Sequence, residues 1–457
     1  MRGLGPALAG GRHEPLETER LSRAGGASRS GARELPIRPP AVRPAVVRPA
    51  AVGPKGGSKR DLHDPDWVIV VAVIALAAVG ILMVYSASAI DSYARSRNTF
   101  QMVAPQIAAG LAGLAAMIVL ARLDYRYLRK VSLIGVIVSL ALLIAVLIPK
   151  IGVSSGGATR WIQLGPFFEI HPAEIAKLAM LVYLAHWLAT RGTEIRSFFH
   201  GTVPYWIIVI PFLVLVAREP DLGTTSIVLF IALTLFFVAG ANLFHLGIAL
   251  AGGAAGGAIL VMTVGKYALQ RIEVYINPWA DPGGSGYHTI KGLEALAAGG
   301  LFGTGLGQDR VLVPQDYNDF VFSVIGQELG FVGGLVVIGL FVAIAWGGIR
   351  TALRAPDTFG GLLAAGITSW ICFQAIINIS VVLALVPVTG ITLPFVSQGG
   401  SSLVVSFAAV GILLSISRET VERGWVNASA DSGRGYGRTY IPGSRGSSIV
   451  AGPASRA

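Results

Sequence analysis

The chain has 457 residues, of which 53% are hydrophobic and only 13% are charged, and its formal net charge is +11. Its mean hydropathy of +0.66 excludes an ordinary soluble domain and predicts an integral membrane protein. The single cysteine, Cys372, excludes an intrachain disulfide framework. No aromatic-interleaved basic patch favours a nucleic acid as a partner.

The two ends of the chain differ in composition from its middle. Residues 1–66 are rich in Gly, Pro, Ala and Arg and lack apolar periodicity, and residues 421–457 repeat this composition. Both segments are typical of disordered tails. The first lacks the short apolar core of a cleaved signal peptide, so we expect the first span to act as the insertion signal. The expected membrane domain is 67–420.

Ten apolar segments within this domain approach the roughly 20 residues that cross a bilayer as a helix. They predict an all-α integral membrane protein with about ten transmembrane helices. Two of the segments, 203–217 and 224–240, are short for a span. The expected spans are 67–88, 102–121, 131–149, 172–190, 203–217, 224–240, 244–264, 321–347, 360–386 and 401–417.

The arginines predict the orientation of these spans. The connections 122–130 and 191–196 are basic and belong in the cytoplasm, which places both tails there as well. The long loop 265–320, between spans seven and eight, then faces outward. A loop of this length predicts a functional and partly folded segment. Cations on the outward side favour an anionic ligand: Arg95, Arg97, Lys150, Arg160, Arg218, Arg271 and Lys291.

Asp281 lies in that loop, in NPWADPGGSGYH (277–288), among glycines and prolines. One interpretation is a turn-forming Asp-Pro. The other is a positioned carboxylate that takes a proton from a hydroxyl nucleophile.

Glu174 and Lys177, in HPAEIAKLAM, lie three residues apart after Pro172, which predicts the first turn of a helix with both side chains on one face. They form either a structural ion pair or, through Lys177 and Arg160 of GATRWIQLG, part of an outward anionic pocket. In REPDLGTT, Glu219 and Asp221 either neutralise Arg218 in a tight turn or anchor a cavity wall.

Two further spans carry polar residues. Glu328, in FSVIGQELGFVGG, must face protein or water, because a carboxylate at the membrane centre costs about 2.5–3.5 kcal/mol. Prolines and glycines interrupt NISVVLALVPVTGITLPFVSQGGSS, and non-helical backbone at membrane depth is expected to line a cavity. We expect this segment to form another wall of the site and to contribute Asn378 and Ser397. The nearby GTGLGQ lacks the strand and helix of a phosphate loop. The histidines have no metal-ligand spacing.

Together these motifs resemble the SEDS family of bacterial cell-wall polymerases over about 67–420. The motifs that carry the resemblance are MVYSASA, GATRWIQLG, HPAEIAKLA, REPDLGT, NPWADPGGSGYH, GLFGTGLGQ, DFVFSVIGQELGFVGG and NISVVLALVPVTGITLPFVSQGGSS. The chain departs where HPAE replaces the usual QPSE, where Lys291 and Gly292 replace Gln-Ser, and at Gln327 and Gln398.

The resemblance implies a glycosyltransferase of the hexosyltransferase class that polymerises lipid II at the outer face of the cytoplasmic membrane and releases undecaprenyl pyrophosphate. It implies a class B penicillin-binding protein and other division membrane proteins as partners. Asp281 matches the family's catalytic acid and would be the general base. Residues implied to bind substrate are Arg160, Glu174, Lys177, Arg218, Arg271, Lys291, Glu328, Asn378 and Ser397.

NPW before the Asp-Pro and SAS after MVY resemble the division branch of the family more than the elongation branch, which predicts a location at the septum. A lipid II flippase, an elongation-type polymerase and a scaffolding protein are the alternatives. The sequence identifies no cofactor and leaves a requirement for a divalent cation undecided.

Overall fold

The computed structural model describes residues 62–96, 100, 103–155, 158–163, 169–264, 266–307 and 318–420. The tails expected at 1–66 and 421–457 lie outside the described residues, except for the short segment 62–66 that leads into the first helix.

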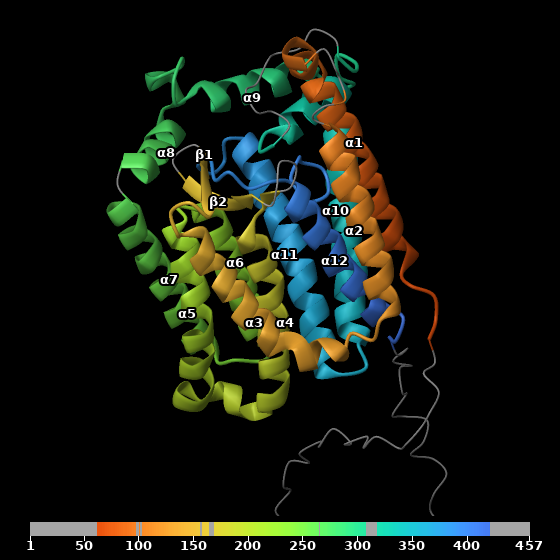
Figure 1. Ribbon diagram of the computed structural model, residues 1–457, viewed down its shortest axis with the longest axis vertical. Coiled ribbons are helices and arrows are strands. Elements are labelled where there is room, and N and C mark those ends of the chain that lie inside the picture. Colours follow the sequence, from red (N-terminus) through yellow and green to blue (C-terminus); the bar gives the residue numbers. More distant parts are fainter. Residues whose placement is uncertain are drawn as a thin grey trace, which may run out of the picture. The chain divides into compact units, whose positions relative to one another are not determined.

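Helices dominate the described residues (Figure 1). Each of the ten expected spans corresponds to a helix with similar bounds. These helices are α1 (Trp67–Ser96), α2 (Val103–Arg122), α3 (Tyr127–Val146), α4 (Pro172–Arg191), α5 (Val203–Arg218), α6 (Leu222–Val238), α7 (Leu243–Val264), α10 (Val321–Arg354), α11 (Thr358–Val382) and α12 (Gly400–Ser417).

Among the described residues, seven helices are long and apolar enough to cross a membrane. The short segment expected at 203–217 is among them, because the π-helical turn η2 (Phe198–Thr202) lengthens α5 to a 21-residue stretch. Three helices fall outside this criterion. Polar side chains such as Glu174, Lys177 and His186 lower the hydropathy of α4, α6 has 17 residues, and α7 is apolar over Leu243–Ala258. The number of ten spans therefore stays a prediction.

The segment 265–320 is partly helical, as expected. It contains α8 (Lys266–Ile276), the 3-10 turn η3 (Pro278–Ala280) and α9 (Tyr287–Gly299).

A small sheet is the one feature that the all-helical prediction lacked. β1 (Gly152–Ser155), β2 (Ala158–Gln163) and β3 (Glu169–Ile170) form an antiparallel sheet in the order β1-β2-β3. Gly152 pairs with Ile162, which pairs with Ile170. Strands of two to six residues are too short to give a recognisable alternation in sequence. The sheet matters because β2 carries Arg160.

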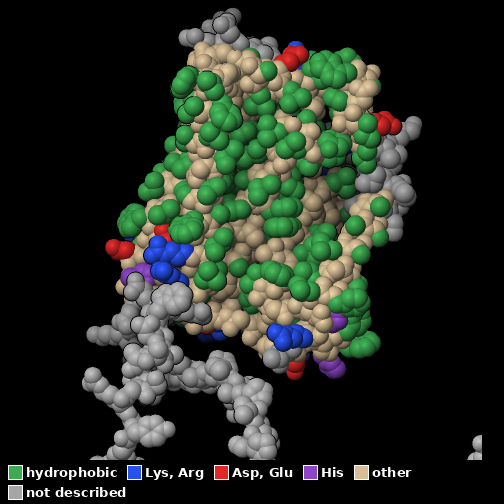
Figure 2. All heavy atoms as spheres, turned by 180° about the vertical axis from the view of Figure 1, so that it is seen from behind, with side chains coloured by type: hydrophobic (Ala, Val, Ile, Leu, Met, Phe, Trp, Pro, Cys, Tyr) green, Lys and Arg blue, Asp and Glu red, His purple; other side chains and the backbone are tan. Residues whose placement is uncertain are grey.

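Glycines allow the helices to approach closely. α2 packs against α12, and a Cβ at Gly113 would lie 2.6 Å from Phe407 Cδ2, while one at Gly411 would lie 2.6 Å from the Met117 carbonyl oxygen. Small residues at helix contacts are typical of membrane proteins, where close packing replaces the hydrophobic effect between helices. The outer surface in Figure 2 is correspondingly covered with hydrophobic side chains, with Lys and Arg gathered at its lower end.

α10 is broken at Gly330, whose φ is 70°. The segment after α9 compensates for the break. Thr304 N donates to Gln327 O at 2.9 Å, and Phe331 N donates to the carbonyl oxygen of Gly300, also at 2.9 Å. A Cβ at Gly303 would lie 2.1 Å from Glu328 O, so only glycine fits there. The GTGLG motif therefore satisfies the backbone of a broken helix, which hydrocarbon would leave unpaired.

The bundle has two distinct ends (Figure 1). We call the end with β1, β2, α8 and α9 the sheet end. The opposite end, with the connections 123–126, 192–197 and 355–357, is the basic end.

Candidate functional site

A cluster of charged and amide side chains occupies the interior at the sheet end. Its members come from β2, the start of α4, the α5–α6 turn, the segment just before α10, and α11. This polar cluster consists of Arg160, His171, Glu174, Lys177, Glu219, Asp221, Asp319, Gln374 and Asn378.

Arg160 holds the turn between α5 and α6. Its Nη2 donates to Pro220 O at 2.6 Å, and its Nε lies 3.8 Å from Asp221 Oδ2. Asp221 also caps α6, since it accepts from Thr224 N at 2.9 Å and from Thr224 Oγ1 at 2.8 Å. Asp221 therefore neutralises Arg160. The sequence alternatives for this turn were that its acids neutralise Arg218 or anchor a cavity wall, and the structure shows no ion pair of Arg218 among the described residues.

The electrostatics of the turn keep Asp221 ionised. Burial opposes its ionisation, but Arg160 and the Thr224 hydrogen bonds outweigh this cost and lower the pKa of Asp221. Burial lowers the pKa of His171 against the pull of Asp221 and Glu174, so its imidazole is neutral at neutral pH. A neutral ring thus lies between two carboxylates.

Glu219 is the opposite case in the same turn. Its side chain is fully buried, and within the described part of the chain neither carboxyl oxygen has a hydrogen-bond partner. Burial and the charge of Asp221, opposed by Arg160, raise its pKa to about 9. Glu219 is therefore a neutral, proton-bearing acid beside an ionised one.

Glu174 and Lys177 form the ion pair expected from their spacing. Lys177 Nζ lies 2.8 Å from Glu174 Oε1, donates to Gln374 Oε1 at 3.1 Å, and lies 5.0 Å from the centre of the Trp370 ring. The lysine is only 1% exposed. The structure therefore shows Glu174 and Lys177 as a buried ion pair. The alternative role of Lys177, contact with an anionic ligand, stays a prediction.

The interrupted segment after α11 packs against the cluster. Asn378 Nδ2 donates to Asp319 O at 2.8 Å and to Ile391 O at 2.7 Å. Ser397 Oγ accepts from Leu393 N at 2.8 Å and so closes the turn before α12. Both residues are buried, which makes them supports of this wall.

Asp319 belongs to the cluster but was not among the expected site residues. It is half-buried, and burial raises its pKa to about 6 although Arg160 and Arg271 oppose this. Arg271 also donates to Val388 O at 3.0 Å, which connects α8 to the same wall. The signal available in the sequence was an acid directly before the first apolar residue of an expected span.

Glu328 lies within α10 and is 1% exposed. Ser86 Oγ of α1 donates to its Oε1 at 2.6 Å. Glu328 thus faces protein, as the cost of a membrane carboxylate requires, and connects α1 to the break in α10.

Asp281 lies apart from these contacts, on an exposed turn between η3 and α9. Its Oδ2 accepts from Ser285 N at 2.8 Å and from Ser285 Oγ at 3.1 Å. The Ser285 hydrogen bonds lower the pKa of Asp281, so the carboxylate is ionised and fixed within its own turn. Asp281 therefore forms a turn, and its role as a general base stays a prediction.

An apolar groove of about 1420 Å³ runs along α5, α6 and α7. Its lining extends from Phe198 and His245 near the basic end to Arg218 and Pro220 at the sheet end. α7 contributes glycines, and a Cβ at Gly252, Gly256 or Gly257 would meet no atom within 4 Å. This volume exceeds the roughly 300–1,000 Å³ of common small-molecule sites, so the groove suits a long apolar chain.

Two further expected cations, Arg218 and Lys291, lie at the surface. The side chains of Arg95 and Arg97 lie outside the described residues. Arg218 is exposed at the groove, and Lys291 pairs with Glu294 at 2.6 Å on the outer side of α9. Within the described ranges no three His, Cys, Asp or Glu side chains gather as metal ligands, so no residues are assigned to a divalent cation.

These features define a multi-pass helical membrane protein with a buried polar cluster and an apolar groove that meet at one end. The family model for FtsW/RodA/SpoVE cell cycle proteins matches residues 66–422. The chain therefore belongs to the FtsW/RodA/SpoVE family.

Individual relatives agree with this assignment. The chain is 41% identical to stage V sporulation protein E of Bacillus subtilis, over 78% of this chain and 97% of that protein. It is 38% identical to the probable peptidoglycan glycosyltransferase FtsW of Trichlorobacter lovleyi, over 78% and 94%.

Solved structures show the same fold. A chain of a peptidoglycan synthase complex that coordinates polymerization and crosslinking is 30% identical, with a TM-score of 0.64, over 78% of this chain and 98% of that one. The rod shape determining protein RodA of Thermus thermophilus is 29% identical, with a TM-score of 0.58, over 78% and 97%.

Proposed function

We propose that this chain is a peptidoglycan glycosyltransferase that polymerises lipid II into glycan strands at the outer face of the cytoplasmic membrane, in septal wall synthesis. The observation that carries this proposal is its similarity to proteins named peptidoglycan glycosyltransferase FtsW over almost their whole length.

The groove supports a polyprenyl-linked substrate. Its apolar lining follows the length of α5 and α7, as a long isoprenoid chain requires, and Arg218 lies at its sheet end. A guanidinium group there can hold a pyrophosphate through paired hydrogen bonds. The groove and the arginine thus match the two chemically different parts of the donor.

Asp281 is the proposed general base. Its carboxylate accepts the proton of the 4-hydroxyl of the acceptor sugar while that oxygen bonds to the anomeric carbon of the donor. The bond from that carbon to the pyrophosphate breaks, and undecaprenyl pyrophosphate leaves. The lowered pKa of Asp281 makes it a weak base, so proton transfer must accompany bond formation and not precede it.

The polar cluster is proposed to support the reaction by forming the walls of the substrate cavity. Arg160, Glu174, Lys177, Glu328, Asn378 and Ser397 are the proposed cavity-wall residues, with Arg271 and Lys291 as cations of the loop. The contacts of Arg160 with Pro220 O and Asp221 hold the α5–α6 turn, and with it Arg218, in position.

A class B penicillin-binding protein, which supplies the crosslinking transpeptidase, and other division membrane proteins are the proposed partners. A solved relative belongs to a complex that combines polymerization and crosslinking, which supports the first of these.

A lipid II flippase is the second candidate, because the groove lining extends from the basic end to the sheet end. Purified protein with its partner, supplied with lipid II in detergent, separates the two. A polymerase produces glycan strands that resolve as a ladder on a gel. Failure to produce them, together with transfer of labelled lipid II across vesicle membranes, would instead establish the flippase.

A further inference from the structure

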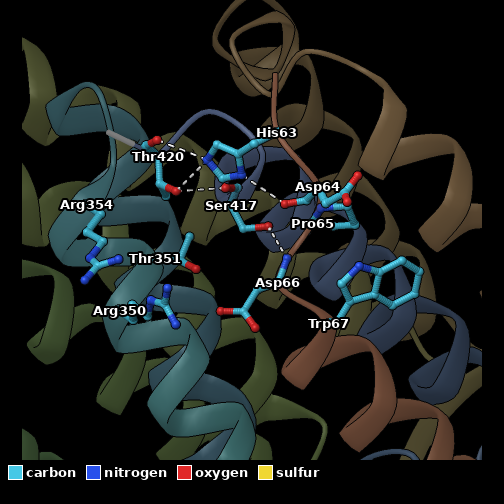
Figure 3. A pocket seen from close by; sticks show the side chains of 10 residues that line it. All are labelled: His63, Asp64, Pro65, Asp66, Trp67, Arg350, Thr351, Arg354, Ser417 and Thr420. Atoms are coloured by element: carbon cyan, nitrogen blue, oxygen red, sulfur yellow. Dashed lines mark hydrogen bonds between the residues drawn. The ribbon is translucent and has the colours of Figure 1, made fainter. Parts of the chain in front are cut away.

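A second cavity, of about 240 Å³, lies at the basic end, away from the polar cluster (Figure 3). Its walls are the segment leading into α1, the last turns of α10, and the residues at the end of α12. No step of the proposed polymerase reaction uses these residues.

One wall is basic. Arg350 and Arg354 lie four residues apart on α10, so both belong to the same helix face. Neither makes a hydrogen bond or ion pair within the described part of the chain. Two other arginines at this end are engaged, since Arg129 pairs with Asp357 at 2.7 Å and Arg418 donates to Ala121 O at 3.2 Å. The two guanidinium groups are therefore available to a ligand.

The facing wall is acidic. Asp64 and Asp66 lie on the segment leading into α1, and Figure 3 shows them across the cavity from the two arginines. Val68 N donates to Oδ1 of Asp66 at 3.0 Å, which leaves the other carboxyl oxygen of Asp66 without a hydrogen bond among the described residues. The Asp64 carboxylate has no hydrogen bond or ion pair among the described residues. No Asp–Arg pair across the cavity is within 4 Å there.

The acidic wall is fixed by hydrogen bonds to Ser417, the last residue of α12, and to Arg418 and Thr420 just after it. Asp66 N donates to Ser417 Oγ at 3.2 Å, and His63 N donates to Arg418 O at 3.1 Å. The imidazole of His63 also contacts Thr420 Oγ1 at 3.0 Å. The acidic wall is therefore fixed in place and cannot close onto the arginines without breaking these bonds.

A cavity with unpaired cations on one wall and carboxylates on the other matches a small zwitterion. Guanidinium groups bind phosphate oxygens in pairs, and a primary ammonium group offers three donors to carboxylates. The volume is below the roughly 300–1,000 Å³ of drug-sized sites, so a headgroup fits and a folded peptide does not. Trp67, 61% exposed beside the acidic wall, is typical of the membrane interface.

We propose that this cavity binds a zwitterionic phosphoethanolamine group, with its phosphate on Arg350 and Arg354 and its ammonium on Asp64 and Asp66. The group has two sources, an aminophospholipid of the adjacent leaflet or a soluble phosphoethanolamine compound. Binding joins the start of α1 to the end of α10, close to Leu62 and Thr420, the first and last described residues of the chain.

Native mass spectrometry of the full chain tests this site. The probes are dioleoyl phosphatidylethanolamine, phosphatidylglycerol, which lacks the ammonium, and phosphatidylcholine, whose ammonium has no hydrogen to donate. The variants are Arg350→Gln/Arg354→Gln and Asp64→Asn. Arg122→Gln is the matched control, because Arg122 is at the same end but does not line the cavity.

The wild type and Arg122→Gln should retain phosphatidylethanolamine about tenfold more tightly than the other two lipids, as expected for charge-assisted hydrogen bonds. The double arginine variant should lose this retention. Asp64→Asn should bind phosphatidylethanolamine no better than phosphatidylglycerol. Unchanged retention by the double variant, or an unchanged preference in Asp64→Asn, would overturn the proposal.

Soluble glycerophosphoethanolamine distinguishes the sources. Displacement of the lipid by this compound supports recognition of the headgroup alone. Retention of the lipid despite an excess of the compound supports a membrane ligand whose acyl chains contribute to affinity.

Discussion

His171 Nε2 lies 3.7 Å from Asp221 Oδ2, and its Nδ1 lies 3.9 Å from Glu174 Oε1, so one imidazole connects the start of α4 to the start of α6. With Arg160 beyond Asp221 and Lys177 beyond Glu174, the side chains form a row in which basic and acidic groups flank a neutral ring. Such a row limits the net buried charge, because each carboxylate has a cation beside it.

The first prediction concerns the proposed base. Asp281→Asn should abolish glycan polymerisation in a purified assay, by about 10²–10⁴-fold, because the amide keeps the shape but accepts no proton. The lowered pKa of Asp281 further predicts that the acidic limb of the pH–rate profile lies below the usual range of an aspartate. Near-normal polymerisation by a properly inserted Asp281→Asn protein would contradict the assignment.

The second prediction separates the two roles of the Glu174–Lys177 pair. Lys177→Met leaves the Glu174 carboxylate buried without its cation, which should destabilise the protein by about 3–5 kcal/mol. Adding Glu174→Gln should recover much of this loss, as measured by unfolding of the detergent-solubilised protein. Equal stability of wild type and Lys177→Met would show that the pair does not support the fold.

The substrate role of Lys177 has its own readout. Exchange of the two residues, Glu174→Lys with Lys177→Glu, keeps an ion pair but moves the positive charge by one helical turn. If Lys177 meets a substrate phosphate in another conformation, the exchange should raise the apparent KM for lipid II. A stable exchanged protein with unchanged kinetics would leave Lys177 with the structural role alone.

The third prediction follows from the protonated state of Glu219. Its pKa in the folded protein, about 9, is raised above the usual carboxyl value, so its contribution to stability is fully present below that usual value and is lost as pH rises through 9. Wild-type stability should therefore fall between pH 7 and pH 10 by a component that Glu219→Gln lacks. Identical pH dependence of melting temperature in both proteins would contradict a neutral Glu219.

The fourth prediction tests the groove. Gly256→Leu adds a side chain into open space on α7 and should raise the KM for lipid II, because it fills the volume proposed for the isoprenoid chain. Folding should not suffer, since leucine has the higher helix propensity. Gly339→Leu is the matched control, because that glycine of α10 also faces open space but lies outside the groove. An equal effect of both substitutions would argue against a substrate groove.

The helices could be located from the sequence, because long apolar segments depend only on local composition. The contacts of the polar cluster could not. Arg160 meets Asp221 only because a three-stranded sheet turns β2 toward the α5–α6 turn, and these strands are too short to recognise. Asp319 was missed because its neighbours Arg160 and Arg271 come from elements more than 40 residues away in the chain. The GTGLG segment was set aside as a doubtful phosphate loop, and only the break in α10 explains it.

The last prediction concerns topology, because the proposed mechanism requires Asp281 to face the exterior, where flipped lipid II is available. Seven helices, α1 to α7, precede α8, so a cytoplasmic N-terminus places the following loop outside if each one crosses the membrane. In a Cys372→Ser background, a cysteine at exposed Ala280 should react with a membrane-impermeant thiol reagent in intact cells. Ala280 is preferable to Ser285, whose side chain bonds to Asp281. A cysteine at exposed Ser197, in the basic connection between α4 and α5, should react only after the membrane is permeabilised. The reverse pattern of labelling would invert the topology and remove Asp281 from the compartment in which its proposed substrate lies.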